Sequence, residues 1–228
     1  MIAARYLRNI GALTEADCLL LKDCRVFIAG CGGLGGHLLS HLLRIGVGHI
    51  TAIDSDCFEP SNLNRQLLCT ESTLGCSKIL SAAQYAAAIN SDVSFQGLQM
   101  QLDKANCDAL IAGHDLVLDA LDNIHTRRAL AAACDRQNIP LVYGAVCGWF
   151  AQVSVFPTGS VLRCMEQIYP KDAVLKDKAC LSFTPAMCAS IQSAEAIKLL
   201  LGKPSELNGQ LLYIDLFTSE WELLPLLV

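Results

Sequence analysis

The sequence predicts an α/β protein with a Rossmann-like fold, in which a mostly parallel sheet carries helices on both faces and ends in antiparallel C-terminal strands. Two observations lead to this prediction. Short β-branched runs alternate along the chain with stretches of helical pattern, as is typical of parallel sheets covered on both faces. The segment GCGGLG, residues 30–35, also joins the first strand pattern directly to the first helical pattern.

The N-terminal half begins with a βαβ unit. RVFIAG (25–30) has the pattern of a strand, residues 33–44 have that of a helix, and HITAID (49–54) has that of a second strand. The alternation continues with a helix, two strands and a further helix, expected over residues 76–89, 93–98, 115–120 and 124–137.

The C-terminal half changes in character. AQVSVFP (151–157) alternates like a strand, and a helix is expected over residues 184–201. Thr184 can cap that helix, Pro185 suits its first position, and Gly202 follows its end. QLLYID and EWELLPL then form a plausible pair of strands, expected to be antiparallel to the rest.

The composition narrows the class of protein. The 228 residues match one domain, residues 1–228, because no linker, repeat or low-complexity tract interrupts them. A net charge of -5 gives no general reason to bind nucleic acid or an anionic membrane. The N-terminus lacks the pattern of a secretory signal, and twelve cysteines without any C-x-x-C pair indicate buried thiols in a reducing cytoplasm.

The glycine-rich segment is the first motif that indicates chemistry. Gly30, Gly32 and Gly35 fit G-x-G-x-x-G between a strand and a helix, where missing side chains allow a tight turn and a close approach of phosphate to the helix N-terminus. Gly33 lies within the same turn, and Asp54 ends the second strand, where an acidic side chain can bind ribose hydroxyls. The sequence therefore predicts a nucleotide site.

The stretch DSDCFEPSNLNRQ, residues 54–66, favours ATP over NAD. A dehydrogenase needs little here beyond the ribose-binding acid, whereas this chain adds a cluster of hydrogen-bonding and charged side chains: Asp56, Asn62, Asn64, Arg65, Gln66 and, at the start of the next helix, Lys78. Arginine and lysine beside a phosphate-binding turn suit a triphosphate whose charge must be neutralised.

With these residues in place, the chain resembles the ThiF/MoeB/HesA family, relatives of the ubiquitin-activating enzymes. The resemblance rests on RYLRNI, GCGGLG, DSDCFEPSNLNRQ, the lysine of GCSK, DALDN and SAEAIKLLLG, which occur in family order and cover nearly the whole chain. It implies a homodimeric adenylyltransferase that uses ATP and Mg²⁺ to activate the C-terminal glycine of a small ubiquitin-like sulfur-carrier protein ending in Gly-Gly. The product would serve thiamine, molybdopterin or a related sulfur-containing metabolite.

The resemblance also implies roles for single residues. Asp54 would hold the ribose, Arg65 and Lys78 would stabilise the phosphates, and Asn62 and Gln66 would shape the same pocket. Asp122 of DALDN would coordinate Mg²⁺, for which oxygen ligands are suitable. Arg8 of RYLR would reach the ATP of the neighbouring subunit.

A cysteine and two departures from the family complete the comparison. Cys180 lies where some relatives carry a thiol that links covalently to the carrier, and Lys176 and Lys178 could lower its pKa. Relatives with zinc carry two C-x-x-C pairs, whereas here Val161 replaces one cysteine and Cys164 stands alone, so we expect no zinc site. Asn9 also replaces the glutamine of the family's N-terminal motif.

Three other functions stay open from the sequence. An enzyme like tRNA threonylcarbamoyladenosine dehydratase would share the ATP site. A NAD-dependent dehydrogenase is disfavoured by Arg65, Lys78 and Asp122, and a non-catalytic nucleotide-binding partner subunit is disfavoured by the intact set of ATP-binding residues.

Overall fold

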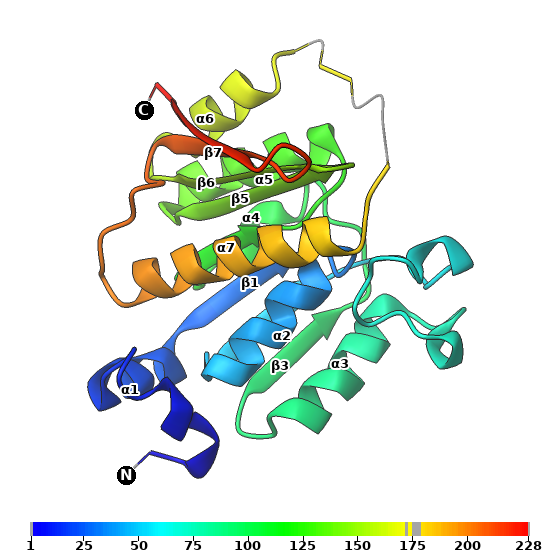
Figure 1. Ribbon diagram of the computed structural model, residues 1–228, viewed down its shortest axis with the longest axis vertical. Coiled ribbons are helices and arrows are strands. Elements are labelled where there is room, and N and C mark those ends of the chain that lie inside the picture. The colour runs from blue at the N-terminus through cyan, green and yellow to red at the C-terminus, as the bar shows by residue number, and fades with distance from the viewer. Residues whose placement is uncertain (1, 172, 175–178, 228) are drawn as a thin grey trace.

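The computed structural model describes residues 2–171, 173–174 and 179–227. Its centre is an eight-stranded sheet with the order β3-β2-β1-β4-β5-β6-β7-β8 (Figure 1). Strands β1 to β5 are parallel to one another, and β6, β7 and β8 each run antiparallel to the preceding strand. The strands are β1 Arg25–Ala29, β2 His49–Ile53, β3 Ser94–Leu98, β4 Leu116–Asp119, β5 Leu141–Cys147, β6 Phe150–Phe156, β7 Gln210–Asp215 and β8 Glu220–Pro225. The expected mixed sheet is confirmed.

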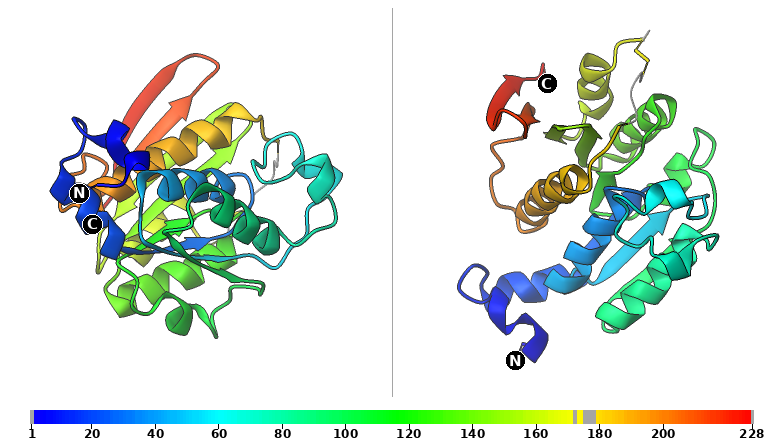
Figure 2. Two further views of the ribbon diagram at one scale, coloured as in Figure 1. Left: turned by 90° about the horizontal axis from the view of Figure 1, so that it is seen from below. Right: turned by 45° about the vertical axis from the view of Figure 1, so that its right-hand side comes forward.

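Helices cover both faces of the sheet, which gives three layers (Figure 2). Helices α2, α3 and α7 lie on one face, and α4, α5 and α6 lie on the other, while α1 packs near the N-terminal end of the chain. The helices are α1 Glu15–Asp23, α2 Gly35–Ile45, α3 Lys78–Ile89, α4 Cys107–Ile111, α5 Ile124–Gln137, α6 Val161–Ile168 and α7 Phe183–Leu200.

Each face of the sheet has its own hydrophobic core, because side chains on a strand alternate between the two faces. In β1, Val26 and Ile28 face the core that α2 and α7 cover, whereas Phe27 and Ala29 face the core that α5 covers. All four of these side chains are fully buried. A strand buried on both faces explains why RVFIAG is a continuous apolar run after its first residue.

One expected capping role is wrong. Thr184 does not cap α7, because the helix begins one residue earlier, at Phe183, after Ser182. The Thr184 hydroxyl is buried and donates a hydrogen bond to the carbonyl oxygen of Gly148, 2.8 Å away, at the turn between β5 and β6. Thr184 therefore attaches the start of α7 to the sheet.

The N-terminal 3₁₀ helix η1, Ala4–Asn9, lies far from the glycine-rich turn. Tyr6 packs where a side chain on Gly46 would lie, and Asn9 Nδ2 donates to the carbonyl oxygen of Ile45 at 3.4 Å, both at the C-terminal end of α2. The glycine-rich turn is at the other end of this 11-residue helix, about 16 Å away along its axis. Among the described residues, no helix is long and apolar enough to cross a membrane.

Candidate active site

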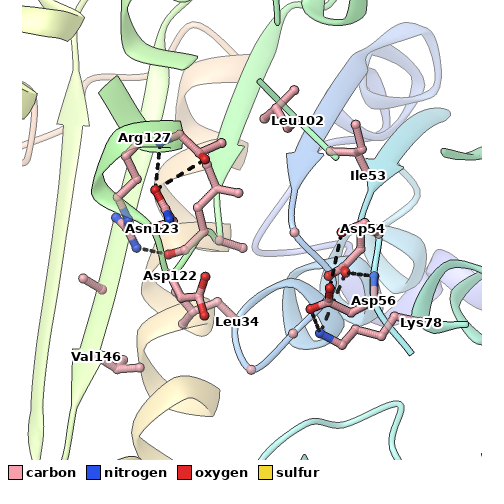
Figure 3. A pocket seen from close by; sticks show the side chains of 18 of the residues that line it. Leu34, Ile53, Asp54, Asp56, Lys78, Leu102, Asp122, Asn123, Arg127 and Val146 are labelled. Atoms are coloured by element: carbon pink, nitrogen blue, oxygen red, sulfur yellow. Dashed lines mark hydrogen bonds and ion pairs between the residues drawn. The ribbon is translucent and has the colours of Figure 1, made fainter. Parts of the chain in front are cut away.

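A cavity of about 540 Å³ opens at the carboxyl ends of β1, β2 and β4. The chain leaves β1 toward β2 on one side and leaves β4 toward β5 on the other, so the cavity lies where the direction of the connections reverses. Open α/β sheets bind their ligands at such a point. Figure 3 shows Asp54, Asp56 and Lys78 on one side of this cavity, and Asp122, Asn123 and Arg127 on the other.

Two glycines of GCGGLG are required by the chain's own packing. Gly30 has a φ of 99°, and a Cβ there would lie 2.8 Å from the carbonyl oxygen of Ala120. At Gly35 a Cβ would overlap the carbonyl oxygen of Gly30. Only glycine fits both positions without moving the backbone of the turn.

The other two glycines leave space that packing does not require. A Cβ on Gly32 would meet the side-chain amide of Gln66 at 3.8 Å, and one on Gly33 would meet Pro185 at 3.6 Å, both ordinary contacts. Gly32 and Gly33 nevertheless line the cavity. They lie just before the N-terminus of α2, where N–H groups without helical partners attract anions. The missing side chains thus keep a phosphate-sized space open.

Asp54 supports the same turn. Its Oδ2 accepts a hydrogen bond from the backbone N–H of Cys31 at 2.8 Å, and its Oδ1 accepts one from the N–H of Asp56 at 2.9 Å. The carboxylate lines the cavity and has lone pairs beyond these two bonds. The Asp54 carboxylate can therefore stabilise the turn and still contact ribose hydroxyls, as expected from the sequence.

Lys78 provides the positive charge nearest to that carboxylate. It is the first residue of α3 and is buried, with its Nζ 2.9 Å from Asp56 Oδ2 and 3.8 Å from Asp54 Oδ1. The hydrogen bond from Lys78 lowers the pKa of Asp56. An ammonium group held between two carboxylates is available to a phosphate that approaches over the glycine turn.

The loop that precedes the 3₁₀ helix η3 (Glu71–Thr73) contributes two residues to the cavity lining, Arg65 and Gln66. Asn62, in the same part of the chain, does not line the cavity. Arg65 Nη1 donates to Ser61 O and Asn64 Oδ1, each at 2.9 Å. Gln66 is buried, and its Oε1 has no hydrogen-bond partner among the described residues, which marks it as a candidate ligand contact. The Asn62 side chain instead accepts the N–H of Glu59 at 3.1 Å, so it shapes the loop.

The opposite wall comes from the loop between β4 and α5. Asp122 lines the cavity with an exposed side chain, while Asn123 Oδ1 accepts the N–H of Thr126 at 3.1 Å and caps α5. The described residues contain no group of three His, Cys, Asp or Glu side chains that could hold a metal alone. A single free carboxylate facing a phosphate site suits Mg²⁺, which binds through one or two carboxylates, phosphate oxygens and water.

Cys180 lies at the edge of the same cavity. Its backbone is held on two sides, because its carbonyl oxygen accepts Asn64 Nδ2 at 2.9 Å and the Gly148 N–H donates to Ala179 O at 2.7 Å. Burial raises the pKa of the Cys180 thiol and Arg65 opposes this shift only in part, so the described residues give no support to the expected low pKa. Lys176 and Lys178, on which that expectation rested, lie outside the described residues.

Two further features of the cavity were not expected from the sequence. Arg127 of α5 reaches the cavity wall, and apolar side chains of Ile53, Leu102 and Val146 line other parts of it (Figure 3). The apolar residues carry no sequence signal that separates them from core residues. Arg127 carries no such signal either, because Asp119 and the backbone carbonyls that it contacts meet it only in the folded chain. By contrast Arg8 is exposed and does not line this cavity.

The doubly wound sheet, the glycine turn beneath a cavity and the cationic and acidic groups around it define a nucleotide-binding α/β protein. The ThiF family model matches residues 6–226, and the chain belongs to the ThiF family. This membership confirms the resemblance noted in the sequence.

Curated relatives match most of the chain. The SAMP-activating enzyme E1 of Haloferax volcanii is 36% identical over 209 residues, which cover 90% of this chain and 77% of the relative. The molybdopterin-synthase adenylyltransferase of Escherichia coli is 35% identical over 211 residues, covering 91% and 85%. The sulfur carrier protein adenylyltransferase of Thermus thermophilus is 36% identical over 205 residues, covering 86% and 76%. They confirm the expected enzyme class, an adenylyltransferase.

Solved structures share the fold at lower sequence identity. Escherichia coli MccB with ATP superposes with a TM-score of 0.87 at 24% identity, covering 99% of this chain and 72% of that one. Escherichia coli tRNA N6-threonylcarbamoyladenosine dehydratase, TcdA, superposes with a TM-score of 0.75 at 22% identity, covering 87% and 94%. At these identities the likeness concerns the fold alone.

Proposed function

We propose that residues 1–228 form a single domain that adenylates the C-terminal glycine carboxylate of a small ubiquitin-like sulfur-carrier protein, with ATP as the second substrate. One observation carries this proposal. The cavity places a buried lysine and an open glycine turn opposite a free aspartate, an arrangement suited to a nucleoside triphosphate with its metal ion. The names of the curated relatives support the sulfur carrier as the class of partner.

ATP would occupy the cavity as follows. Its phosphates would lie over Gly32 and Gly33 at the N-terminus of α2, and its ribose would contact Asp54. The apolar side chains of Ile53 and Leu102 give the adenine ring a surface for packing. Gln66, whose Oε1 lacks a hydrogen-bond partner among the described residues, would gain one from the bound substrates.

The reaction needs positioning and charge neutralisation rather than a general base. A C-terminal carboxylate has a reference pKa of about 3.3 to 3.7, so it is ionised at neutral pH. One of its oxygens forms a bond to the α-phosphorus, and the bond from that phosphorus to the bridging oxygen breaks, so that pyrophosphate leaves with the electron pair. Lys78 and Arg65 would offset the charge that moves onto the leaving group.

Asp122 would hold Mg²⁺, which supplies further neutralisation of the phosphate charge when it is bound. Arg8 does not line the cavity of its own chain, so its proposed role requires a homodimer in which it reaches the partner's nucleotide. Cys180 lines the cavity near Arg65, where its thiolate would attack the carbonyl carbon of the acyl adenylate to form a thioester, with AMP leaving as the acyl–phosphate bond breaks. That transfer would follow adenylation and is not needed for it.

The first experiment is ATP–pyrophosphate exchange with purified protein, Mg²⁺ and a set of small carriers ending in Gly-Gly. Exchange should require a carrier, disappear when the carrier lacks its last glycine, and fall to background in Asp122→Ala. The carrier that supports exchange would also identify the pathway. If the protein binds ATP but no carrier supports pyrophosphate exchange, the proposal is contradicted, and a tRNA substrate or an inactive subunit becomes the next hypothesis. Binding of NAD in place of ATP would overturn the proposal.

A further inference from the structure

A buried ion pair lies at the wall of the cavity, which Arg127 lines. Asp119, the last residue of β4, and Arg127, in the first turns of α5, are both inaccessible to solvent or nearly so. Arg127 Nη1 is 2.9 Å from Asp119 Oδ2. Although burial disfavours the charged guanidinium, Asp119 and the two neighbouring tyrosines raise the pKa of Arg127, so it stays charged.

The pair holds the two peptide groups that flank Leu121. Asp119 Oδ1 accepts the backbone N–H of Leu121 at 3.0 Å, and Arg127 Nη2 donates to the carbonyl oxygen of the same residue. The Leu121 carbonyl belongs to the peptide that joins Leu121 to Asp122, and Asp122 lines the cavity (Figure 3). The orientation of the peptide from which Asp122 emerges is therefore set by the ion pair.

The surroundings hold the pair itself in place. The Arg127 guanidinium lies 5.0 Å from the ring centre of Tyr143 and 5.8 Å from that of Tyr169, and Nη2 also donates to Gly144 O at 2.9 Å. On the other side, Gln192 Nε2 of α7 donates to the backbone carbonyl of Asp119 at 3.0 Å. Contacts from α5, α7, β5 and the residue that follows α6 thus converge on a single loop. Because buried ion pairs contribute little net stability, stability alone does not explain why Asp119 and Arg127 are paired here.

We propose that Asp119 and Arg127 are positioning residues, which hold the backbone at Leu121 so that the Asp122 carboxylate faces the nucleotide phosphates and their metal ion across from Lys78. This inference rests on the proposed function, because it assigns the pair to the orientation of Asp122 in that reaction. Outer partners of metal-binding side chains have large effects when removed, about 10- to 100-fold in affinity or activity.

The first test compares two Arg→Lys substitutions on the same helix. Arg127→Lys keeps the positive charge but loses the fork that spans Asp119 and Leu121. Arg136→Lys is the matched control, because Arg136 forms an exposed ion pair with Asp108, at 2.7 Å, away from the cavity. In carrier-dependent exchange, Arg127→Lys should lower kcat about 10- to 100-fold, while KM for ATP changes less than about threefold. An equal loss of kcat in both variants would overturn the inference.

A double-mutant cycle separates positioning from a general structural effect. If Arg127 acts through Asp122, Arg127→Lys should cause little further loss of kcat when Asp122 is already Asn, since residues that act as a unit are strongly non-additive. A loss of the same factor in both backgrounds would show that Arg127 works independently of Asp122, contrary to the proposal.

A measurement without substrates keeps the inference separate from the proposed function. Hydrogen exchange of the backbone N–H of Leu121 should accelerate in Arg127→Lys and stay unchanged in Arg136→Lys. This result does not depend on whether any carrier supports ATP–pyrophosphate exchange. If Arg127→Lys does not fold, the paired variant Asp119→Asn/Arg127→Gln removes both charges without leaving one unpaired and serves in its place. Unaltered protection of Leu121 in the folded variant would refute the positioning role. Absence of carrier-dependent ATP–pyrophosphate exchange by the unmodified protein would refute only the proposed reaction.

Discussion

At the scale of single residues, Lys78 combines burial, position and charge in an unusual way. Its ammonium group lies between two carboxylates at the start of α3, and its own backbone N–H donates to Asp56 O at 3.0 Å. The two aspartates balance the positive charge of this buried ammonium group and hold it at the mouth of the glycine turn.

Replacing this lysine should affect the reaction more than the fold. Lys78→Met keeps the length of the stem and removes the charge, and we expect carrier-dependent exchange to fall about 100- to 1,000-fold, as for other groups that stabilise developing charge. Lys203→Met is the control, since Lys203 pairs with Asp17 at 3.1 Å on the surface. Initial rates of pyrophosphate exchange measure both, and equal rates for the two variants would contradict the role of Lys78.

The same substitution should change the titration of Asp56. The hydrogen bond from Lys78 is the largest cause of its lowered pKa, so in Lys78→Met the pKa of Asp56 should rise toward its usual value. Carboxyl chemical shifts followed by NMR through the acid range would show this. Asp108, whose pKa is lowered chiefly by Arg136, should titrate identically in both proteins.

The Cys180 thiol should be slow to react in the protein without substrates. Burial raises its pKa, so less thiolate is present at neutral pH than on an ordinary cysteine. Cys57 and Cys76 are exposed and should be alkylated by iodoacetamide first. Mass spectrometry of peptides after short labelling measures the order, and labelling of Cys180 ahead of both would show that its thiol is activated after all.

At the scale of elements, the glycine-rich turn before α2 divides into positions needed for folding and positions needed for binding. Gly35→Ala should destabilise the protein by about 1 to 3 kcal/mol, as overpacked substitutions do, because the new Cβ overlaps Gly30 O. Gly32→Ala should leave the melting temperature without nucleotide unchanged and weaken ATP binding, since its Cβ meets only ordinary contacts but enters the cavity.

Thermal unfolding and ATP titration of the two variants measure these separate effects. A stable Gly35→Ala protein, or a Gly32→Ala protein that binds ATP as well as the unmodified chain, would contradict the division.

Elements with strong periodicity were predictable from the sequence, whereas those defined by distant contacts were not. The βαβ unit around residues 25–54 was correct because β-branched runs and glycines mark it locally. Thr184 was assigned as a cap because its position fits the pattern, but its hydroxyl bonds Gly148, 36 residues earlier. For the same reason the sequence placed Lys78 and Asp122 but not Arg127, whose importance depends on contacts with Leu121 and Gly144 backbone carbonyls.

At the scale of the whole molecule, three partly buried histidines link stability to pH. Burial lowers the pKa values of His37, His41 and His114 below the ordinary 6.5. As the pH falls, the unfolded chain therefore binds protons before the native protein does. The contribution of these histidines to stability is complete above about pH 6.5 and decreases as the pH falls below it.

Urea unfolding at pH 7.5 and 5.5 should accordingly show a lower free energy of unfolding at the acidic value. His114 hydrogen-bonds Thr51 Oγ1 at 2.9 Å, and His114→Gln should reduce the difference between the two pH values even if it lowers stability overall. His125→Gln, at an exposed position of α5, should leave the difference unchanged. An unchanged difference in His114→Gln would show that this histidine does not contribute to the link.

The order of strands in the sheet also bears on how the chain matures during synthesis. Strands β5 to β8 are neighbours both in the chain and in the sheet, so each can add to the growing edge as soon as it leaves the ribosome. By contrast β1 needs β4, which is made about 90 residues later. The cavity draws residues from Gly30 to Cys180. A nascent chain therefore cannot complete the wall of this cavity until Cys180 has emerged, whereas β7 and β8 are made later and contribute no residue to it.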